Sequence, residues 1–349
     1  MSQVVNNVGL LVALVLPIGT TSTISASYFG FWGPDPPSEM RGFTNLAFAC
    51  SLPEVFSNHA HGIDSLLKIE DIFVNQSVRW HFRLNSDYET RWAAYAAQLA
   101  PFIANRTLLG FFLGDELLWN GLNFTEMETM ANAVRAAFPR SANGGASAVI
   151  YTNGAWPTLF PTMPGETTSP GNIGAVPNAQ LWLHVPAALD WWGVDVYPDQ
   201  FSQEGALTVL HSNVLRKFTA PDQRLVLIPP FYGDRVNSSS AVTRQLDCGS
   251  SNCDDAMVSW AEQFLRTFLN ASWADAARVV AAMPYRWTGI SDGSGRRAQG
   301  GKELPGARAA WEAVGRAVVA ARTAGARGLS LPHVNSGSWK SFVLSASVP

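Results

Sequence analysis

The chain alternates apolar segments of strand length with amphipathic segments of helix length along most of its sequence. Short apolar runs bounded by turn residues predict strands, whereas apolar residues three or four positions apart predict helices. Helices are predicted at 63–73, 85–103, 123–138, 204–218, 256–269 and 304–321. Strands are predicted at 24–32, 43–50, 78–84, 108–113, 146–152, 189–199, 224–234 and 279–287. This order predicts an α/β fold, a single-domain (β/α)8 TIM barrel over residues 28–349.

An open, doubly wound sheet is the alternative α/β architecture for this order of elements. Its nucleotide-binding form is disfavoured because no Gly-x-Gly-x-x-Gly or Gly-Lys-Ser/Thr motif follows any predicted strand. Hydrophobic residues make up 47% and charged residues 15% of the 349 residues, which excludes a disordered chain. The net charge of −3 and the lack of a Lys/Arg cluster argue against nucleic acid as a partner.

The first 27 residues differ in character from the rest of the chain. An apolar run at 8–18 is too short to span a bilayer stably and has the length of a signal-peptide core. No Lys or Arg precedes this run, so a buried N-terminal strand or hairpin is the alternative. Secretion as a glycoprotein is favoured by five Asn-x-Ser/Thr sequons, at Asn75, Asn105, Asn123, Asn237 and Asn270.

The cysteines fit the same compartment. Cys248 and Cys253 flank Gly-Ser-Ser-Asn in a loop and predict a small disulfide, because no second Cys/His pair completes a zinc site. Cys50 ends an apolar strand, and we predict that its thiol is free and buried.

The predicted strand at 108–113 is followed directly by two adjacent carboxylates, Asp115 and Glu116. In parallel α/β sheets, the carboxyl ends of the strands are where ligands bind. A solvated turn is the alternative explanation, since most charged side chains lie in water. Because adjacent residues of an extended chain point to opposite faces, we expect only one of the two carboxylates to face the centre of the site.

Aromatic and amide side chains follow the other predicted strands in the same way. Flat rings cover the C–H faces of sugars, and amides and carboxylates bond to sugar hydroxyls, whereas anionic ligands would require Arg and Lys. An oligosaccharide, polysaccharide or glycoconjugate is therefore the expected partner. The predicted substrate-binding residues are Trp32, Trp119, Asn153, Trp156, Tyr197, Tyr232, Tyr285 and Trp287.

Cleavage of a glycosidic bond requires two carboxyl groups, one of which protonates the leaving oxygen. We predict Glu116 as this acid, with Asp115 as the neighbour that raises its pKa. The second carboxylate is predicted to be Asp195 or, next, Asp234. A structural role for Asp195, bonded to a turn or to Arg286, is an equal alternative.

Trp32, the carboxylate pair, Tyr232 and Trp287 follow strands one, four, seven and eight of the prediction, and in this respect the chain resembles the (β/α)8-barrel glycoside hydrolases. In the largest clan of that superfamily, strand four ends in Asn-Glu, with the Glu as acid/base, and strand seven ends in a nucleophilic Glu. The resemblance implies the acid/base position for Glu116, with Asp115 in place of the Asn. The segment 229–234 contains no Glu, and the chitinase-like Asp-x-x-Asp-x-Asp-x-Glu run is missing, so no family is assigned.

The sequence thus predicts a secreted glycoside hydrolase without a cofactor. A catalytically inactive carbohydrate-binding barrel and a metal-dependent hydrolase are the alternatives. A metal-dependent hydrolase would need metal ligands, and the candidates His59, His61 and His81 are too scattered in sequence to predict a metal site.

Overall fold

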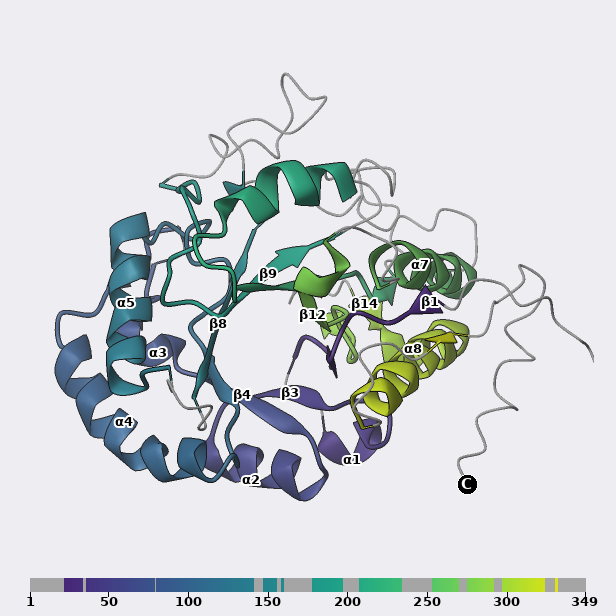
Figure 1. Ribbon diagram of the computed structural model, residues 1–349, viewed down its shortest axis with the longest axis horizontal. Helices are drawn as coiled ribbons and strands as arrows, with labels where there is room; N and C mark the ends of the chain where they lie inside the picture. The colour runs from purple at the N-terminus through teal and green to yellow at the C-terminus, as the bar shows by residue number, and fades with distance from the viewer. Residues whose placement is uncertain are drawn as a thin grey trace, which may run out of the picture.

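Eight parallel strands form one sheet in which neighbours in space are also neighbours along the chain. The computed structural model describes residues 22–33, 36–78, 80–140, 147–155, 158–159, 178–196, 207–233, 253–269, 275–291, 297–323 and 330–331. The strands are β2 (Tyr28–Phe29), β3 (Leu46–Ala49), β4 (Asp64–Lys68), β7 (Gly110–Phe112), β8 (Val149–Gly154), β9 (Trp191–Asp195), β10 (Arg224–Ile228) and β12 (Val279–Ala282). Figure 1 shows them as a ring with helices outside, so the predicted (β/α)8 barrel is confirmed.

Asn45 joins the first and last strands of the sheet order, β2 and β3. Its backbone N–H donates to the Phe29 carbonyl at 2.9 Å, and its side-chain amide donates to the Ser27 carbonyl at 3.1 Å. The Phe29 N–H donates in turn to Asn45 Oδ1 at 2.8 Å. One side-chain amide therefore bridges the gap between two short strands and brings the sheet close to closure.

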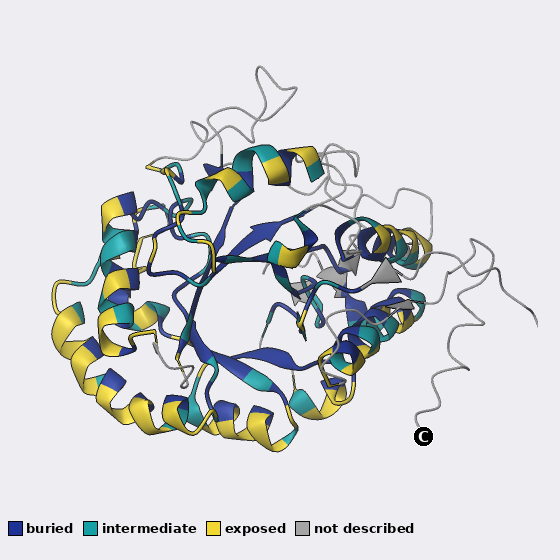
Figure 2. Ribbon diagram, viewed as in Figure 1, coloured by how far each residue is buried: buried dark blue, intermediate teal, exposed yellow. Residues whose placement is uncertain are grey.

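The helices that cover the barrel are α1 (Pro37–Met40), α2 (Leu52–Ala60), α3 (Glu70–Phe73), α4 (Tyr88–Ala104), α5 (Phe124–Ala137), α7 (Cys253–Phe268) and α8 (Pro305–Thr323). Short helical turns are η3 (Leu210–Val214), η4 (Leu215–Lys217), η6 (Ala276–Arg278) and η7 (Gly301–Glu303). Their buried sides face the strands and their exposed sides face outward (Figure 2). None of the helices in the described ranges is both long and apolar enough to cross a membrane.

The start of α5 shows how the sequence sets a helix boundary. Asn123 Oδ1 accepts from the Glu126 N–H at 2.9 Å, and Glu126 Oε2 accepts from the Asn123 N–H at 3.0 Å. This reciprocal capping box satisfies backbone donors that have no partner inside the helix. It confirms the cap predicted at this position.

The inside of the barrel is filled by side chains that alternate along the strands. The ring of Trp32 packs with centroids 4.7 Å from Phe48 and 5.2 Å from Phe112, and Tyr151 lies 5.3 Å from Phe112. These aromatic rings close the interior from below and form a floor under the carboxyl ends of the strands.

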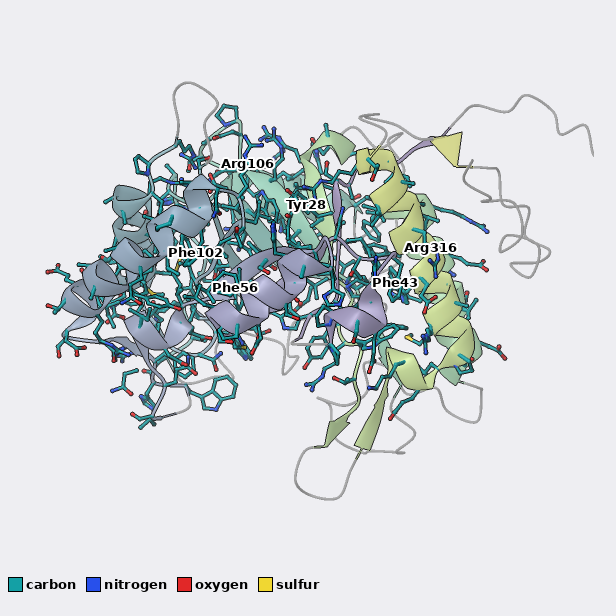
Figure 3. All side chains as sticks on the ribbon, turned by 90° about the horizontal axis from the view of Figure 1, so that it is seen from below. Tyr28, Phe43, Phe56, Phe102, Arg106 and Arg316 are labelled. Carbon is teal, nitrogen blue, oxygen red and sulfur yellow. The ribbon has the colours of Figure 1, made fainter. Side chains whose placement is uncertain are left out.

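A second apolar layer lies between the strands and the helices. On the outside of this layer, the Arg316 guanidinium lies over the ring of Phe43 at 5.6 Å, and Phe56 of α2 packs against Phe102 of α4 at 5.2 Å (Figure 3). These contacts extend the packing from neighbouring helices to the surface.

The third barrel strand differs from the prediction. Segment 63–73, predicted as a helix, contains β4 and the short helix α3, whereas 78–84, predicted as the strand, contributes only β6 (Arg83–Leu84). β6 pairs outside the barrel with β5 (Val74–Asn75). The two predictions are wrong because a short strand with apolar residues on both faces shows no two-residue period.

The N-terminal boundary also differs. β1 (Ser22–Thr23) pairs antiparallel with β15 (Ser330–Leu331), and the side chains of Ile24 and Ala26 are buried in the core. Residues 22–27, which lie before the predicted start of the barrel, are therefore ordered and packed against its core. The apolar run at 8–18 lies outside the described residues.

Cys50 is exposed, so the prediction of a buried thiol is wrong. It follows the last residue of β3, where the chain leaves the packed sheet for the open end of the barrel. Cys248 lies outside the described residues, as does the side chain of Cys253 at the start of α7. The remaining strands of the structure form a small antiparallel sheet of β11 (Tyr232–Gly233), β14 (Arg297–Gly300) and β13 (Ile290–Ser291).

Candidate active site

The chain leaves β7 through a sharp turn that starts at Gly114. Gly114 has φ +154°, and Glu116 has φ +49°, a left-handed conformation that a residue with a side chain rarely adopts. The Gly114 carbonyl accepts from Thr152 Oγ1 at 2.9 Å, and the Glu116 carbonyl accepts from the Asn120 N–H at 2.9 Å. The strand pairing therefore ends at Gly114, and a turn fixes the two carboxylates that follow.

This turn brings both carboxylates to the same site. Asn153 Nδ2 donates to Asp115 Oδ1 at 3.0 Å. Burial, followed by the charges of Asp115 and Asp195, raises the pKa of the Glu116 carboxyl well above its usual range. The expectation that only one of the pair faces the centre assumed an extended chain, and the left-handed turn at Glu116 departs from that alternation.

Asp195 is the last residue of β9 and is only 8% exposed. It makes no ion pair within the described part of the chain, and the Arg286 Nε donates to the Thr288 carbonyl at 3.0 Å. The alternative in which Arg286 neutralises Asp195 is therefore wrong. Burial, then the charge of Asp115, raises the pKa of Asp195 well above its usual range, and the amide of Asn153 opposes this shift as a hydrogen-bond donor.

Asn153 links the two aspartates. It lies in β8, between β7 and β9 in the sheet, and its side chain is buried. Gly193 of β9 leaves room for it, since a Cβ there would lie 2.9 Å from Asn153 Oδ1 and 2.3 Å from the Tyr151 hydroxyl. Both of these oxygens are buried and have no hydrogen-bond partner in the structure.

Two charged residues that the sequence analysis missed come from the end of β4. Lys68 Nζ lies 5.8 Å above the ring of Phe112, and its charge lowers the pKa of Asp115, which burial raises. Glu70 follows two residues later, and burial, then the charge of Asp115, raises its pKa to about 7. A correct prediction of the third strand would have placed both residues at its carboxyl end.

Two tryptophans meet near the turn after β7. The rings of Trp119 and Trp80 pack at 90° with centroids 5.9 Å apart, and both side chains are partly exposed. Gly121, at φ +96°, holds the loop of Trp80 close, because a Cβ there would lie 2.4 Å from the Trp80 carbonyl oxygen. Trp119 was predicted as a substrate-binding residue. Trp80 was not, because it lies in the segment 78–84, which was wrongly predicted to be a barrel strand.

Trp32 and Trp287 occupy different positions from each other. Trp32 belongs to the aromatic floor and is nearly buried. Trp287 has no exposed surface: its Nε1–H donates to Glu39 Oε2 at 3.1 Å, and the Arg308 guanidinium covers its ring at 5.1 Å. The prediction that Trp287 binds substrate is wrong, since its ring turns outward after β12 into the layer beneath α8.

Tyr285 remains at the site. It is partly exposed after β12, and burial raises the pKa of its hydroxyl, to which Asp115 and Asp195 contribute. The peptide bond between Tyr285 and Arg286 is cis. The predicted residues Trp156, Tyr197 and Asp234 and the sequons Asn237 and Asn270 lie outside the described residues, as does the side chain of Tyr232.

The histidines do not gather at the site. His59 lies in the last turn of α2 and His61 caps its end, so both lie at the opposite end of the barrel from the carboxylates. His81 Nδ1 lies 3.1 Å from Asn178 Nδ2 in an exposed loop. Across the described ranges, no group of three or more His, Cys, Asp or Glu side chains has the arrangement of a metal site.

No protein-family model matches this sequence, and no curated protein matches it. Among solved structures, the chain is similar to a GH113 β-1,4-mannanase, with 11% identity, a TM-score of 0.48, and coverage of 86% of this chain and 99% of that one. It is also similar to the GH113 β-mannanase AaManA from Alicyclobacillus acidocaldarius, with 13% identity, a TM-score of 0.47, and coverage of 86% of this chain and 99% of that one. For a thermostable xylanase mutant from Cellvibrio japonicus, the identity is 12%, the TM-score is 0.47, and the coverage is 83% of this chain and 97% of that one. Identities of this size carry no information about catalytic residues or substrates.

Proposed function

We propose that this protein is a glycoside hydrolase that cleaves O-glycosidic bonds by carboxylate acid/base catalysis. The observation that carries the proposal is the meeting of three carboxyl groups at the carboxyl end of a (β/α)8 barrel. Asp115 and Asp195 share the amide of Asn153, and the charges of both act on Glu116. Carboxyl groups with strongly shifted pKa values in such a position are typical of catalytic sites.

Glu116 takes the role of general acid. Its pKa is raised by burial and by two neighbouring carboxylates, and no hydrogen bond or cation from the described residues opposes this shift. It therefore holds its proton to a higher pH than an ordinary Glu and donates that proton to the leaving oxygen as the glycosidic bond breaks.

Asp115 and Asp195 supply the opposing negative charge together. The amide of Asn153 stabilises the charged form of both, and Lys68 favours the ionised form of Asp115. Two buried carboxyl groups that interact this strongly titrate as a pair, so we assign one negative charge to the two of them. That charge stabilises the oxocarbenium-like centre or activates the attacking group. Asp234 remains the alternative second carboxylate.

The substrate is proposed to be neutral and rich in hydroxyl groups. The Trp80 and Trp119 rings, packed at a right angle, offer an apolar corner near the carboxylates, and Asp115, Glu116 and Asp195 offer hydrogen-bonding groups. A sugar ring has both an apolar face and a set of hydroxyls, so it matches these two features at once.

Activity on aryl glycosides and on polysaccharides tests the function. The wild-type protein is expected to release the aryl group or new reducing ends, and Glu116→Gln is expected to lose this turnover while sugar binding is retained. A protein that binds oligosaccharides in calorimetry but turns over none of the substrates would instead support the inactive carbohydrate-binding barrel. Turnover abolished by a chelator and restored by a divalent metal would support the metal-dependent hydrolase.

We also propose that the protein is secreted and glycosylated. The described sequon residues Asn75, Asn105 and Asn123 are all exposed. Expression of the full chain in a eukaryotic secretory host is expected to give a protein in the medium whose mass falls on treatment with an N-glycosidase. A protein that stays inside the cell with its N-terminal segment uncleaved would contradict the proposal.

A further inference from the structure

Glu70 is a largely buried carboxyl group that the proposed mechanism does not use. It follows β4 by two residues and is the first residue of α3. The Ile69 N–H donates to the Phe112 carbonyl at 3.1 Å, which fixes the end of β4 beside the end of β7. Glu70 therefore starts from a backbone position next to the turn that carries Asp115.

The carboxyl group of Glu70 packs directly against this turn. A Cβ built on Gly114 would lie 2.8 Å from both Cδ and Oε1 of Glu70. Any residue other than Gly at this position would displace the carboxyl group, in addition to the strain of a φ of +154°. The missing side chain of Gly114 thus creates the space that brings Glu70 to the residue before Asp115.

The charges around Glu70 come from each element that packs against it. Asp115 lies on the turn after β7, Asp71 follows in α3, and Lys68 ends β4, while Gln76 supplies a hydrogen bond. Burial is the largest influence and, with Asp115, raises the pKa of Glu70 to about 7, although Lys68 and Gln76 act in the opposite direction.

We propose that Glu70 is a positioning residue of the active site whose charge, held against the turn at Gly114, controls how tightly Asp115 holds its proton. When Glu70 is protonated, Asp115 carries the negative charge beside Asn153. When Glu70 loses its proton to solvent, a second negative charge lies close to Asp115, which then holds a proton more tightly. Each carboxyl group exchanges its proton with water, and no bond other than O–H changes. The role in turnover rests on the proposed glycosidase function, whereas the coupling of the two charges does not.

Carboxyl ¹³C NMR on the full chain, labelled at Glu side chains, tests the coupling of the two charges without any assay of activity. The Glu70 resonance, assigned as the one lost in Glu70→Gln, is expected to titrate with a midpoint near 7. In Asp115→Asn the midpoint is expected to fall by about 1 pH unit, because a like charge has been removed while burial remains. A midpoint in the usual range of Glu, or one that Asp115→Asn leaves unchanged, would overturn the proposal.

A kinetic experiment tests the consequence for turnover. In Glu70→Gln the limb of the kcat/KM profile near pH 7 is expected to disappear, and Glu70→Asp is expected to restore a limb, shifted in pH. Glu89→Gln, which removes an exposed carboxylate of α4, is the matched control and is expected to keep the wild-type profile. A profile for Glu70→Gln identical to that of the wild type would contradict the role in turnover. If no glycoside is cleaved at all, the NMR midpoints still decide whether the charges of Glu70 and Asp115 are coupled, so the two proposals fail separately.

Discussion

Two aspartates at the opposite ends of β9 have different surroundings. Asp190, directly before β9, lies at the amino end of the barrel, where it forms ion pairs with Arg135 and with Arg140, the latter at 2.9 Å. Its Oδ2 also accepts from the Ile150 N–H at 2.8 Å. Asp195, the last residue of β9, is more deeply buried, and among the described residues it has only the amide of Asn153 and the like charges of its neighbours.

The comparison separates carboxylates that stabilise the fold from carboxylates that we propose to perform chemistry. A buried charge with cations and N–H donors around it is compensated, whereas a buried charge beside other carboxylates raises the energy of the folded state. Such an unfavourable arrangement is characteristic of functional sites, where shifted pKa values are needed. The two ends of one strand thus differ in what their aspartates contribute, and mutations at each end should have different effects.

The largest effect is expected for Glu116→Gln at the carboxyl end. Loss of a general acid lowers turnover by roughly 10²–10⁴-fold. Because Gln replaces a buried carboxyl whose charged form is disfavoured by burial and by Asp115 and Asp195, the free energy of unfolding is expected to be unchanged or higher. Turnover on an aryl glycoside and urea denaturation measure the two quantities. Wild-type turnover in the variant would show that Glu116 is not the acid.

At the amino end, Asp190→Ala is expected to lower the free energy of unfolding by about 3 kcal/mol, because it leaves a buried arginine without its partner. The Arg135 side chain is only 14% exposed, so water replaces the lost ion pair poorly. The measurement is urea denaturation at neutral pH. Turnover per folded molecule should stay at the wild-type level, and a specific loss of turnover with normal stability would reverse the distinction between the two ends.

Asp195→Asn is expected to change stability in the opposite direction, by about 1 kcal/mol in favour of the folded state at pH 7. The folded-state pKa of Asp195 is raised above that of the unfolded chain. The folded state therefore binds the proton more tightly, and stability contributed by this group is present at low pH and lost as pH rises above about 4. The variant should lack that part of the decline while losing turnover. Unfolding curves across pH 4–8 test this, and a lower stability of the variant at pH 7 would contradict it.

The sequence alone predicts the barrel and the centre of the site for a physical reason. β7 and β9 are apolar runs that end in Asp115 and Asp195, and charges directly after a buried strand stand out from their neighbours. The order of strands around a barrel follows the order of the chain, so residues at successive strand ends are brought together by topology. Asn153 is placed correctly by the same argument.

Residues whose position depends on local backbone geometry could not be predicted. Glu116 joins the cluster through a left-handed φ, and Glu70 reaches it because Gly114 has no side chain. Trp287 lies beyond the end of a strand, as predicted, but its ring points away from the inside of the barrel and packs in the apolar layer between strands and helices. Strand ends can be located from apolar runs, whereas the direction of the side chains in the turns after them depends on contacts between distant segments.

The smallest effect is expected for Asp222→Ala, which also acts on Arg140. Asp222 Oδ2 lies 3.5 Å from the Arg140 Nε, and the Asp222 side chain is 55% exposed. An exposed ion pair contributes little, so the free energy of unfolding should change by less than about 0.5 kcal/mol. Arg140 thus contacts two aspartates, Asp190 and Asp222, that differ mainly in burial. If Asp222→Ala proved as destabilising as Asp190→Ala in the same urea titration, closeness to an arginine alone would account for stability at this end. Burial of Asp190 would then no longer explain its contribution to stability. It would also no longer distinguish Asp190 from Asp195, which makes no ion pair within the described residues.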